Sequence, residues 1–145
     1  MFAWRYRIHA ICVLSVLAIL FVPWYMNKPD KNTVDATNNA ALEFLQMVDA
    51  GRYDDSWQIV APYLQKKIPL PDWKSKLAKD RKTIGELDSR SLEDASKTAA
   101  TEEFPDSELI LLKYSSQFKL KEVEEVVTVI QGKDNRWRVV GYFIQ

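Results

Sequence analysis

The sequence predicts an α+β domain that follows one N-terminal transmembrane helix. Three observations lead to this prediction: an uncharged apolar stretch at residues 10–26, helical apolar periodicity across residues 37–85, and segments of strand character across residues 89–144. The helices all precede the strands. This order indicates an α+β arrangement, because an α/β fold would alternate the two kinds of element along the chain.

The length and charge of the chain limit the classes of protein to which it can belong. With 145 residues it has room for one compact domain and an anchor. Its 20 basic and 20 acidic residues balance, but several of the bases lie near the apolar stretch and leave the remaining domain mildly acidic. A mildly acidic domain does not attract nucleic acid, so we predict no nucleic-acid partner.

The apolar stretch at residues 10–26 is the predicted membrane span. It carries no charge, and roughly 17 to 25 such residues cross a bilayer. Trp24 and Tyr25 end it, and Trp4 and Tyr6 precede it, as aromatic residues do at the two membrane interfaces. We therefore predict a bacterial inner-membrane protein with a cytoplasmic tail at 1–9, a transmembrane anchor at 10–26, a linker at 27–38 and an exported, periplasmic domain at 39–145.

Other interpretations of this stretch remain open. A cleaved signal peptide needs small residues soon after the apolar run, whereas here a suitable site lies only at residues 34–36. A buried core helix would have a polar face, which this stretch lacks. Orientation is weakly determined, because Arg5 and Arg7 on one side face Lys28 and Lys31 on the other. A short tail before a single span favours the exported domain.

Three amphipathic helices are predicted after the linker. The first covers residues 37–50, with apolar side chains at i, i+3, i+4 and i+7, and a glycine follows it. The second begins at Asp54 or Asp55, and Pro62 is expected to kink or restart it. The third covers residues 71–85 and begins with proline and ends with glycine. Each helix has one apolar face and needs a common surface to cover.

Four antiparallel strands are predicted to supply that surface. In several of these segments the apolar residues occupy alternate positions, as expected for a sheet with one covered face. The turn at residues 132–135 predicts a hairpin between the last two strands. Three helices packed on a curved four-stranded antiparallel sheet define a roll of the cystatin-like or nuclear-transport-factor-like (NTF2-like) kind, which often encloses a cavity. The strands are expected at residues 89–98, 108–119, 122–131 and 136–144.

A buried charge is predicted on the third strand. Glu125 has the same parity as the apolar Val123 and Val127, so its carboxylate is expected to point inward. A buried carboxylate needs a cationic partner, and Arg81 or Arg90 can provide it. We predict an ion pair that fixes the third helix against the sheet. A polar spot for a ligand and a general acid or base remain alternatives.

Large aromatic residues are the second group of candidates. Trp57, Trp73, Trp137 and Tyr142 have spacings that fit core packing, and they equally fit a pocket for an apolar or aromatic ligand. The tentative ligand-binding set is therefore Trp57, Trp73, Arg81, Arg90, Glu125, Trp137 and Tyr142.

Several catalytic chemistries are excluded by residues that the domain lacks. His9 is the only histidine and Cys12 the only cysteine, and neither lies in the predicted domain. Imidazole bases, thiol nucleophiles and the usual zinc ligands are therefore missing there. The sequence also contains neither a phosphate-binding loop nor a Gly-x-Ser-x-Gly element. We predict no metal, no cofactor and no catalytic residue, and hence no enzyme activity.

A set of short elements spread along the domain matches one known bacterial family. The matching elements are Phe44-Leu45, Val48-Asp49, Gly51-Arg52-Tyr53, Ser56-Trp57, Trp73, Arg81, Ile84-Gly85, Ser89-Arg90, Glu125-Val-Val-Thr-Val and Trp137-Arg-Val-Val-Gly-Tyr142. Through these elements the domain resembles the family known as domain of unknown function four thousand and nineteen. The resemblance covers nearly all of residues 39–145 and implies small membrane-anchored or exported proteins, without naming an activity. It also implies a glycine-bearing turn at residues 102–106, where this chain has no glycine.

Taken as a whole, the sequence predicts a non-catalytic envelope protein whose roll domain binds a partner protein or a small ligand near the membrane. One alternative is a scaffold subunit of a secretion or conjugation assembly, which rests on analogy of domain order. The other is an enzyme that uses carboxylates in its cavity, as an isomerase or dehydratase would.

Overall fold

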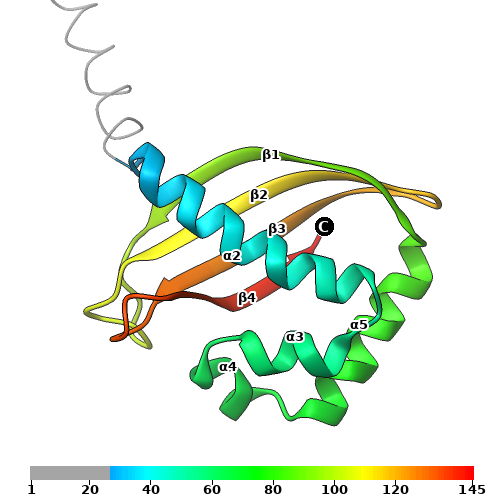
Figure 1. Cartoon of the computed structure of the whole chain (residues 1–145), viewed down its shortest axis with the longest axis horizontal. Coiled ribbons are helices and arrows are strands. Elements are labelled where there is room, and N and C mark those ends of the chain that lie inside the picture. The colour runs from blue at the N-terminus through cyan, green and yellow to red at the C-terminus, as the bar shows by residue number, and fades with distance from the viewer. Residues whose placement is uncertain (1–26) are drawn as a thin grey trace, which may run out of the picture.

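The computed structural model describes residues 27–145, which form a single antiparallel sheet with helices packed against it. Figure 1 shows α2 lying across the sheet, with α3, α4 and α5 gathered beyond β4. The predicted α+β class is confirmed. The elements are α2 (Lys31–Asp49), α3 (Tyr53–Ile59), α4 (Pro62–Lys67), α5 (Leu70–Ile84), β1 (Leu87–Thr98), β2 (Leu109–Phe118), β3 (Glu122–Gln131) and β4 (Trp137–Ile144).

The four strands follow one another in space as they do in the sequence. Their order is β1-β2-β3-β4, and every neighbouring pair is antiparallel. The predicted hairpin at residues 132–135 is present, since the Gly132 N–H donates to the Arg136 carbonyl at 2.8 Å. Because the order is that of a meander, β1 and β4 are the two edge strands of the sheet. The four-stranded antiparallel prediction is confirmed.

Helix α2 begins at Lys31, six residues before the predicted start. The Asp30 side chain caps it by accepting a hydrogen bond from the Thr33 N–H at 3.1 Å. Residues 31–38, predicted as part of a linker, therefore form the first turns of the helix. Val34 packs against the core, and buried Thr37 donates its hydroxyl to the Thr33 carbonyl at 2.7 Å. The apolar stripe of the helix thus extends further back than the strongly hydrophobic residues indicate.

The predicted second helix is two helices, α3 and α4. Val60, between them, is extended, and the Ala61 N–H donates to the Val139 carbonyl of β4 at 2.8 Å. Pro62 then occupies the first turn of α4. Proline fits there because its missing N–H would have had no helical partner. The restart expected at Pro62 is confirmed, and the break joins the helical layer to the edge of the sheet.

The core lies between α2 and the inner face of the sheet. Phe44 and Leu45 of α2 are fully buried, as are Ile110 of β2 and Val127 of β3. Burying each such side chain contributes about 1.5 to 3 kcal/mol. The rings of Phe44 and Tyr142 meet edge-on at 5.4 Å between centroids. The helix is therefore fixed over the middle of the sheet, which positions its C-terminal end near the charged residues described below.

Within residues 27–145, no helix is long and apolar enough to cross a membrane. The predicted cytoplasmic tail at 1–9 and the predicted transmembrane anchor at 10–26 lie outside the described residues.

Candidate functional site

Four charged side chains from four different elements meet at one end of the core. Asp49 ends α2, Arg81 belongs to the last turn of α5, Arg90 to β1 and Glu125 to β3. The Glu125 side chain is fully buried, because its strand parity points it into the interior as Val123 and Val127 also point. We call these four residues the charge cluster.

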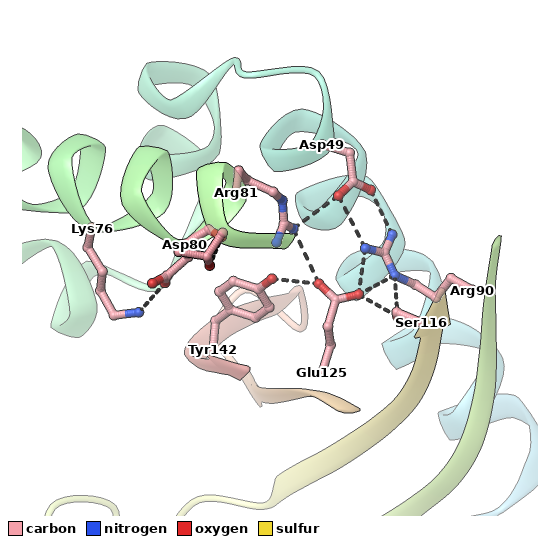
Figure 2. Close-up of polar contacts among 9 residues, drawn as sticks. Asp49, Lys76, Asp80, Arg81, Arg90, Ser116, Glu125 and Tyr142 are labelled. Atoms are coloured by element: carbon pink, nitrogen blue, oxygen red, sulfur yellow. Dashed lines mark hydrogen bonds and ion pairs between the residues drawn. The ribbon is translucent and has the colours of Figure 1, made fainter. Parts of the chain in front are cut away.

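Each carboxylate of the charge cluster contacts both guanidinium groups, as Figure 2 shows. Arg90 lies 2.7 Å from Asp49 Oδ2 and 2.6 Å from Glu125 Oε2. Arg81 Nη2 lies 3.0 Å from Asp49 Oδ1 and 3.2 Å from Glu125 Oε1. The four ion pairs close a ring with no net charge. Such balance is what makes buried charges tolerable, since an unpaired one costs several kcal/mol.

Two neutral hydroxyls complete the surroundings of Glu125. Ser116 donates to Oε2 at 2.6 Å and Tyr142 donates to Oε1 at 2.5 Å. Burial alone would raise the pKa of Glu125, but the charge of Arg90, these two hydrogen bonds and Arg81 together lower it below its usual value. Burial and the neighbouring Glu125 carboxylate raise the pKa of Tyr142. Glu125 is therefore ionised and Tyr142 is neutral at neutral pH.

Arg81 is also held by aromatic rings. Its Cζ lies 5.1 Å from the ring centroid of Phe118 and 5.8 Å from that of Tyr142. Nε and Nη1 of Arg81 are buried and make no hydrogen bond within residues 27–145. The ring faces compensate in part, because a desolvated cation over an aromatic face gains up to about 2 kcal/mol.

The predicted pairing of Glu125 with Arg81 or Arg90 is present in the structure, and it involves both arginines. Asp49 was missed. A signal for it exists, because Ala41, Leu45 and Asp49 follow one another at four-residue steps and so lie on one face of a helix. The charge cluster joins α2, α5, β1 and β3, so it fixes the helices against the sheet.

An apolar cleft of about 520 Å³ lies next to the charge cluster, between α4, α5, the loop at residues 101–104 and β4. Ligand sites commonly have volumes of about 300 to 1,000 Å³. The walls include Tyr63 and Leu64 of α4, Phe104 of the loop, and Val140 and Phe143 of β4. The rings of Tyr63 and Phe104 meet edge-on at 4.7 Å. We call this space the β4 cleft.

Two of the four predicted aromatic residues line the β4 cleft, namely Trp73 and Tyr142. The Trp73 Nε1–H donates to buried Ser56 at 3.0 Å, which holds its ring against the cleft. Trp57 and Trp137 are not among the lining residues. The Trp57 Nε1–H donates to the Ile68 carbonyl at 3.0 Å, and Trp137 packs against the core.

Sequence reasoning missed the other aromatic residues of the cleft: Tyr63, Phe104 and Phe143. Tyr63 and Phe104 lie on a short helix and a loop, where no periodicity marks a face. Phe143 falls on the outer parity of β4, and 59% of its surface is exposed. Of these three residues, only Phe143 carried a signal that sequence reasoning could have used, because a large apolar residue on the outward parity of a strand marks a candidate interaction site.

The charged residues around the β4 cleft are already paired with one another. The Lys67 ammonium lies 3.1 Å from Glu103, and the Lys76 ammonium lies 2.8 Å from Asp80. The cleft therefore has an apolar floor and a rim with no net charge, which suits an uncharged apolar group better than an ion.

No group of three or more histidine, cysteine or acidic residues within residues 27–145 is arranged to hold a metal ion.

Comparison with known proteins identifies the family of the chain and nothing more specific. No curated protein and no solved structure matches the chain. A family profile described as "Protein of unknown function (DUF4019)" matches residues 40–142, which include the charge cluster and every lining residue of the β4 cleft except Phe143. The chain belongs to this family, as its sequence motifs predicted.

Proposed function

We propose that this protein is a non-catalytic binding module that takes an apolar segment of a ligand or partner into the β4 cleft. The observation that carries the proposal is the cleft itself, with its volume of about 520 Å³ and its apolar and aromatic walls. The rings of Tyr63, Phe104 and Phe143 are at least partly exposed in the cleft, and each offers a ligand contact area with few rotatable bonds. Binding a ligand against these rings therefore requires little ordering of side chains.

The state of the charge cluster supports a non-catalytic role. A general acid or base works best with a pKa near the working pH, whereas the pKa of Glu125 is lowered. The carboxylate oxygens of Glu125 already contact Arg81, Arg90 and two hydroxyls. We assign the charge cluster to positioning: it fixes the floor of the cleft through Tyr142.

The wider proposal is that the domain works next to a bacterial inner membrane, on the periplasmic side, anchored by residues 10–26. Support comes from the charge-free apolar sequence of that stretch and its flanking aromatic residues. The helices over an antiparallel meander also agree with a cystatin-like or NTF2-like roll, in which a cleft between helices and sheet is a common binding place.

Binding to the cleft can be tested with the uncharged apolar dye N-phenyl-1-naphthylamine. Trp73 lines the cleft, so a bound dye should quench tryptophan fluorescence in a saturable way. Phe143→Glu places a charge in the cleft at an exposed position and should weaken dye binding at least tenfold.

Leu120→Glu is the matched control for this experiment. Leu120 is the other large exposed apolar residue of the described domain, with 70% of its surface exposed, and it does not line the cleft. Its variant should bind the dye as the wild type does. Equal binding by wild type and Phe143→Glu, or quenching that never saturates, would rule out the cleft as the site.

A further inference from the structure

One edge of β4 points its backbone groups away from the sheet. Gln145 and Glu124 exchange two hydrogen bonds, with N···O distances of 2.9 and 3.1 Å. In an antiparallel pair such doubly bonded positions alternate with positions whose N–H and C=O point outward. From this register Gly141 and Phe143 bond to β3, whereas Tyr142 and Ile144 direct their N–H and C=O to the open edge.

The neighbouring strand pair agrees with this assignment. The Phe118 N–H donates to the Lys121 carbonyl at 3.0 Å, which sets the alternation between β2 and β3. Glu125 and Val127, which face Ile144 and Tyr142, thereby use their backbone groups toward β2. The backbone N–H and C=O groups of Glu125 and Val127 are therefore not available to Ile144 and Tyr142 of β4.

Within residues 27–145, the outward backbone groups of β4 have a backbone partner at Val139 but not at Tyr142 or Ile144. Upstream, the outward carbonyl of Val139 accepts from the Ala61 N–H, so the chain itself completes the edge at that point. No such backbone bond is made by Tyr142 or Ile144 in the described part of the chain. Unpaired edge groups of this kind form a template for another extended chain.

Two hollows lie in series along this same edge. The β4 cleft adjoins residues 140–143, and a second hollow of about 330 Å³ adjoins Ile144 and Gln145. Successive turns of α5 form the opposite wall, with Trp73 and Leu77 at the first hollow and Ile84 at the second. The edge and α5 therefore border a groove about six residues long, or roughly 20 Å at a rise of about 3.3 Å per residue.

We propose that the natural occupant of the β4 cleft is an extended peptide segment of a partner protein, which pairs with Tyr142 and Ile144 as a fifth strand. This inference rests on the proposed function and names its partner class. Main-chain hydrogen bonds to the two outward positions hold the segment, and its apolar side chains of one parity enter the cleft. Phe143, exposed at the rim, covers the segment from the outer face.

The geometry favours a partner segment over two other occupants. A second copy pairing β4 to β4 would bring two such edges within about 4.8 Å. Residues of α4 and α5 line the hollows beside this edge, so such a pairing would have to fit these helices from both copies around one joined edge, whereas a single extended segment meets them only once. The first described residue, Asn27, lies at the opposite edge of the sheet, since its carbonyl accepts from the Lys97 N–H of β1 at 2.8 Å.

Amide exchange on the full chain, measured by NMR, tests the edge directly. In the free protein, the Tyr142 and Ile144 amides should exchange at least tenfold faster than those of Gly141 and Phe143. Addition of a capped peptide in which valine and threonine alternate between terminal lysines should slow only the two outward amides. Equal protection of all four amides without peptide would overturn the proposal, because the edge would then already be occupied.

Ester substitution in the same peptide separates main-chain pairing from apolar contact. Replacing the N–H of alternate residues by an ester oxygen changes no side chain. One parity of substitution should weaken binding at least tenfold, and the other should leave it within twofold. Equal effects for both parities, or no binding of the peptide up to millimolar concentration, would overturn the fifth-strand proposal.

The dye measurement keeps the two proposals distinguishable. If the dye binds saturably and the peptides show no dependence on parity, the cleft is a binding site but its occupant is not a strand. If the dye does not bind, but ester substitution at one set of alternate peptide residues still weakens peptide binding, the proposed apolar site is wrong and the proposed pairing with the β4 edge is supported.

Discussion

The Tyr142 hydroxyl donates to Glu125 Oε1 at 2.5 Å while the Tyr142 ring lines the β4 cleft. One side chain therefore belongs both to the charge cluster and to the candidate binding site. The ring cannot turn into the cleft without losing a hydrogen bond to a buried carboxylate, a bond worth about 1.5 to 3 kcal/mol. The charge cluster thus keeps the floor of the cleft in one conformation.

Removing the charge of Glu125 should destabilise the domain. Glu125→Gln leaves Arg81 and Arg90 with only Asp49 as a carboxylate partner, and breaking a buried pair from one side costs about 3 to 5 kcal/mol. The free energy of unfolding in urea measures the loss. Glu124→Gln is the control, because Glu124 is partly exposed and its pair with Lys113 at 3.5 Å should contribute about 0 to 1 kcal/mol. Equal losses in the two variants would contradict the prediction.

The stabilisation from Glu125 should disappear in acid. Its pKa is lowered in the folded state, so the contribution is present above the usual value of 4.5 and is lost as the pH falls through the folded pKa. The difference in unfolding free energy between wild type and Glu125→Gln should therefore be constant from pH 7 to about pH 5 and shrink below about 4.5. A difference that grows on acidification would reverse the sign of the assigned shift.

Tyr142→Phe should separate stability from binding. The variant loses the hydroxyl that donates to Glu125 and keeps the ring that lines the cleft. We expect a loss of about 1.5 to 3 kcal/mol in unfolding free energy and dye binding within twofold of wild type. Tyr63→Phe serves as control, since its hydroxyl meets the exposed Lys67. A large loss of dye affinity in Tyr142→Phe would mean that the hydroxyl itself contacts the occupant.

Two glycines with positive φ should differ in their tolerance of alanine. Gly85 has φ 84° and ψ −160°, a region essentially reserved for glycine, and an added Cβ would lie 3.1 Å from the Leu120 side chain. Gly51 has φ 72° and open space around it. Gly85→Ala should cost about 1 to 3 kcal/mol from the backbone, with the displacement of Leu120 added, and Gly51→Ala should cost less. Thermal unfolding of the two variants provides the comparison.

A topology reporter tests the proposed location. Alkaline phosphatase, which is active only after export, should be active when fused after Gln145 in a bacterial host. The inverted orientation predicts activity only from a reporter that works in the cytoplasm. Replacing two apolar residues of the stretch at 10–26 by lysine should release the protein from membranes, and retention would show that another segment holds it.

Local patterns in the sequence predicted most of the fold. The bounds of β3 match the prediction because Val123, Val127 and Val129 mark its parity, and Gly132 begins the turn that follows. The start of α2 was missed for a physical reason. Its first two turns are mostly polar, and the stripe there depends on Val34 and Thr37, whose burial only the tertiary structure reveals.

The candidate site was less predictable than the fold. Strand parity was enough to predict that Glu125 turns inward and needs an arginine. The four-way ring required the end of α2 to meet the end of α5, and no local pattern encodes that meeting. The β4 cleft depends in the same way on the place of α4 and of Phe104 relative to β4, which is set by tertiary packing.

The early start of α2 shortens the free chain between the domain and anything that precedes it. The predicted twelve-residue linker at 27–38 would allow the domain to move up to about 40 Å from its point of attachment. Because α2 begins at Lys31, only residues 27–30 precede it, and they span about 14 Å at most. The Asn27 carbonyl accepts from the Lys97 N–H and Lys28 pairs with Asp94, so this short segment is itself fixed along β1. If residues 10–26 sit in a bilayer, the end of β1 rests close to the lipid headgroups. If the domain is also exported, as we propose, the opposite edge of the sheet, β4, lies on the side away from the membrane.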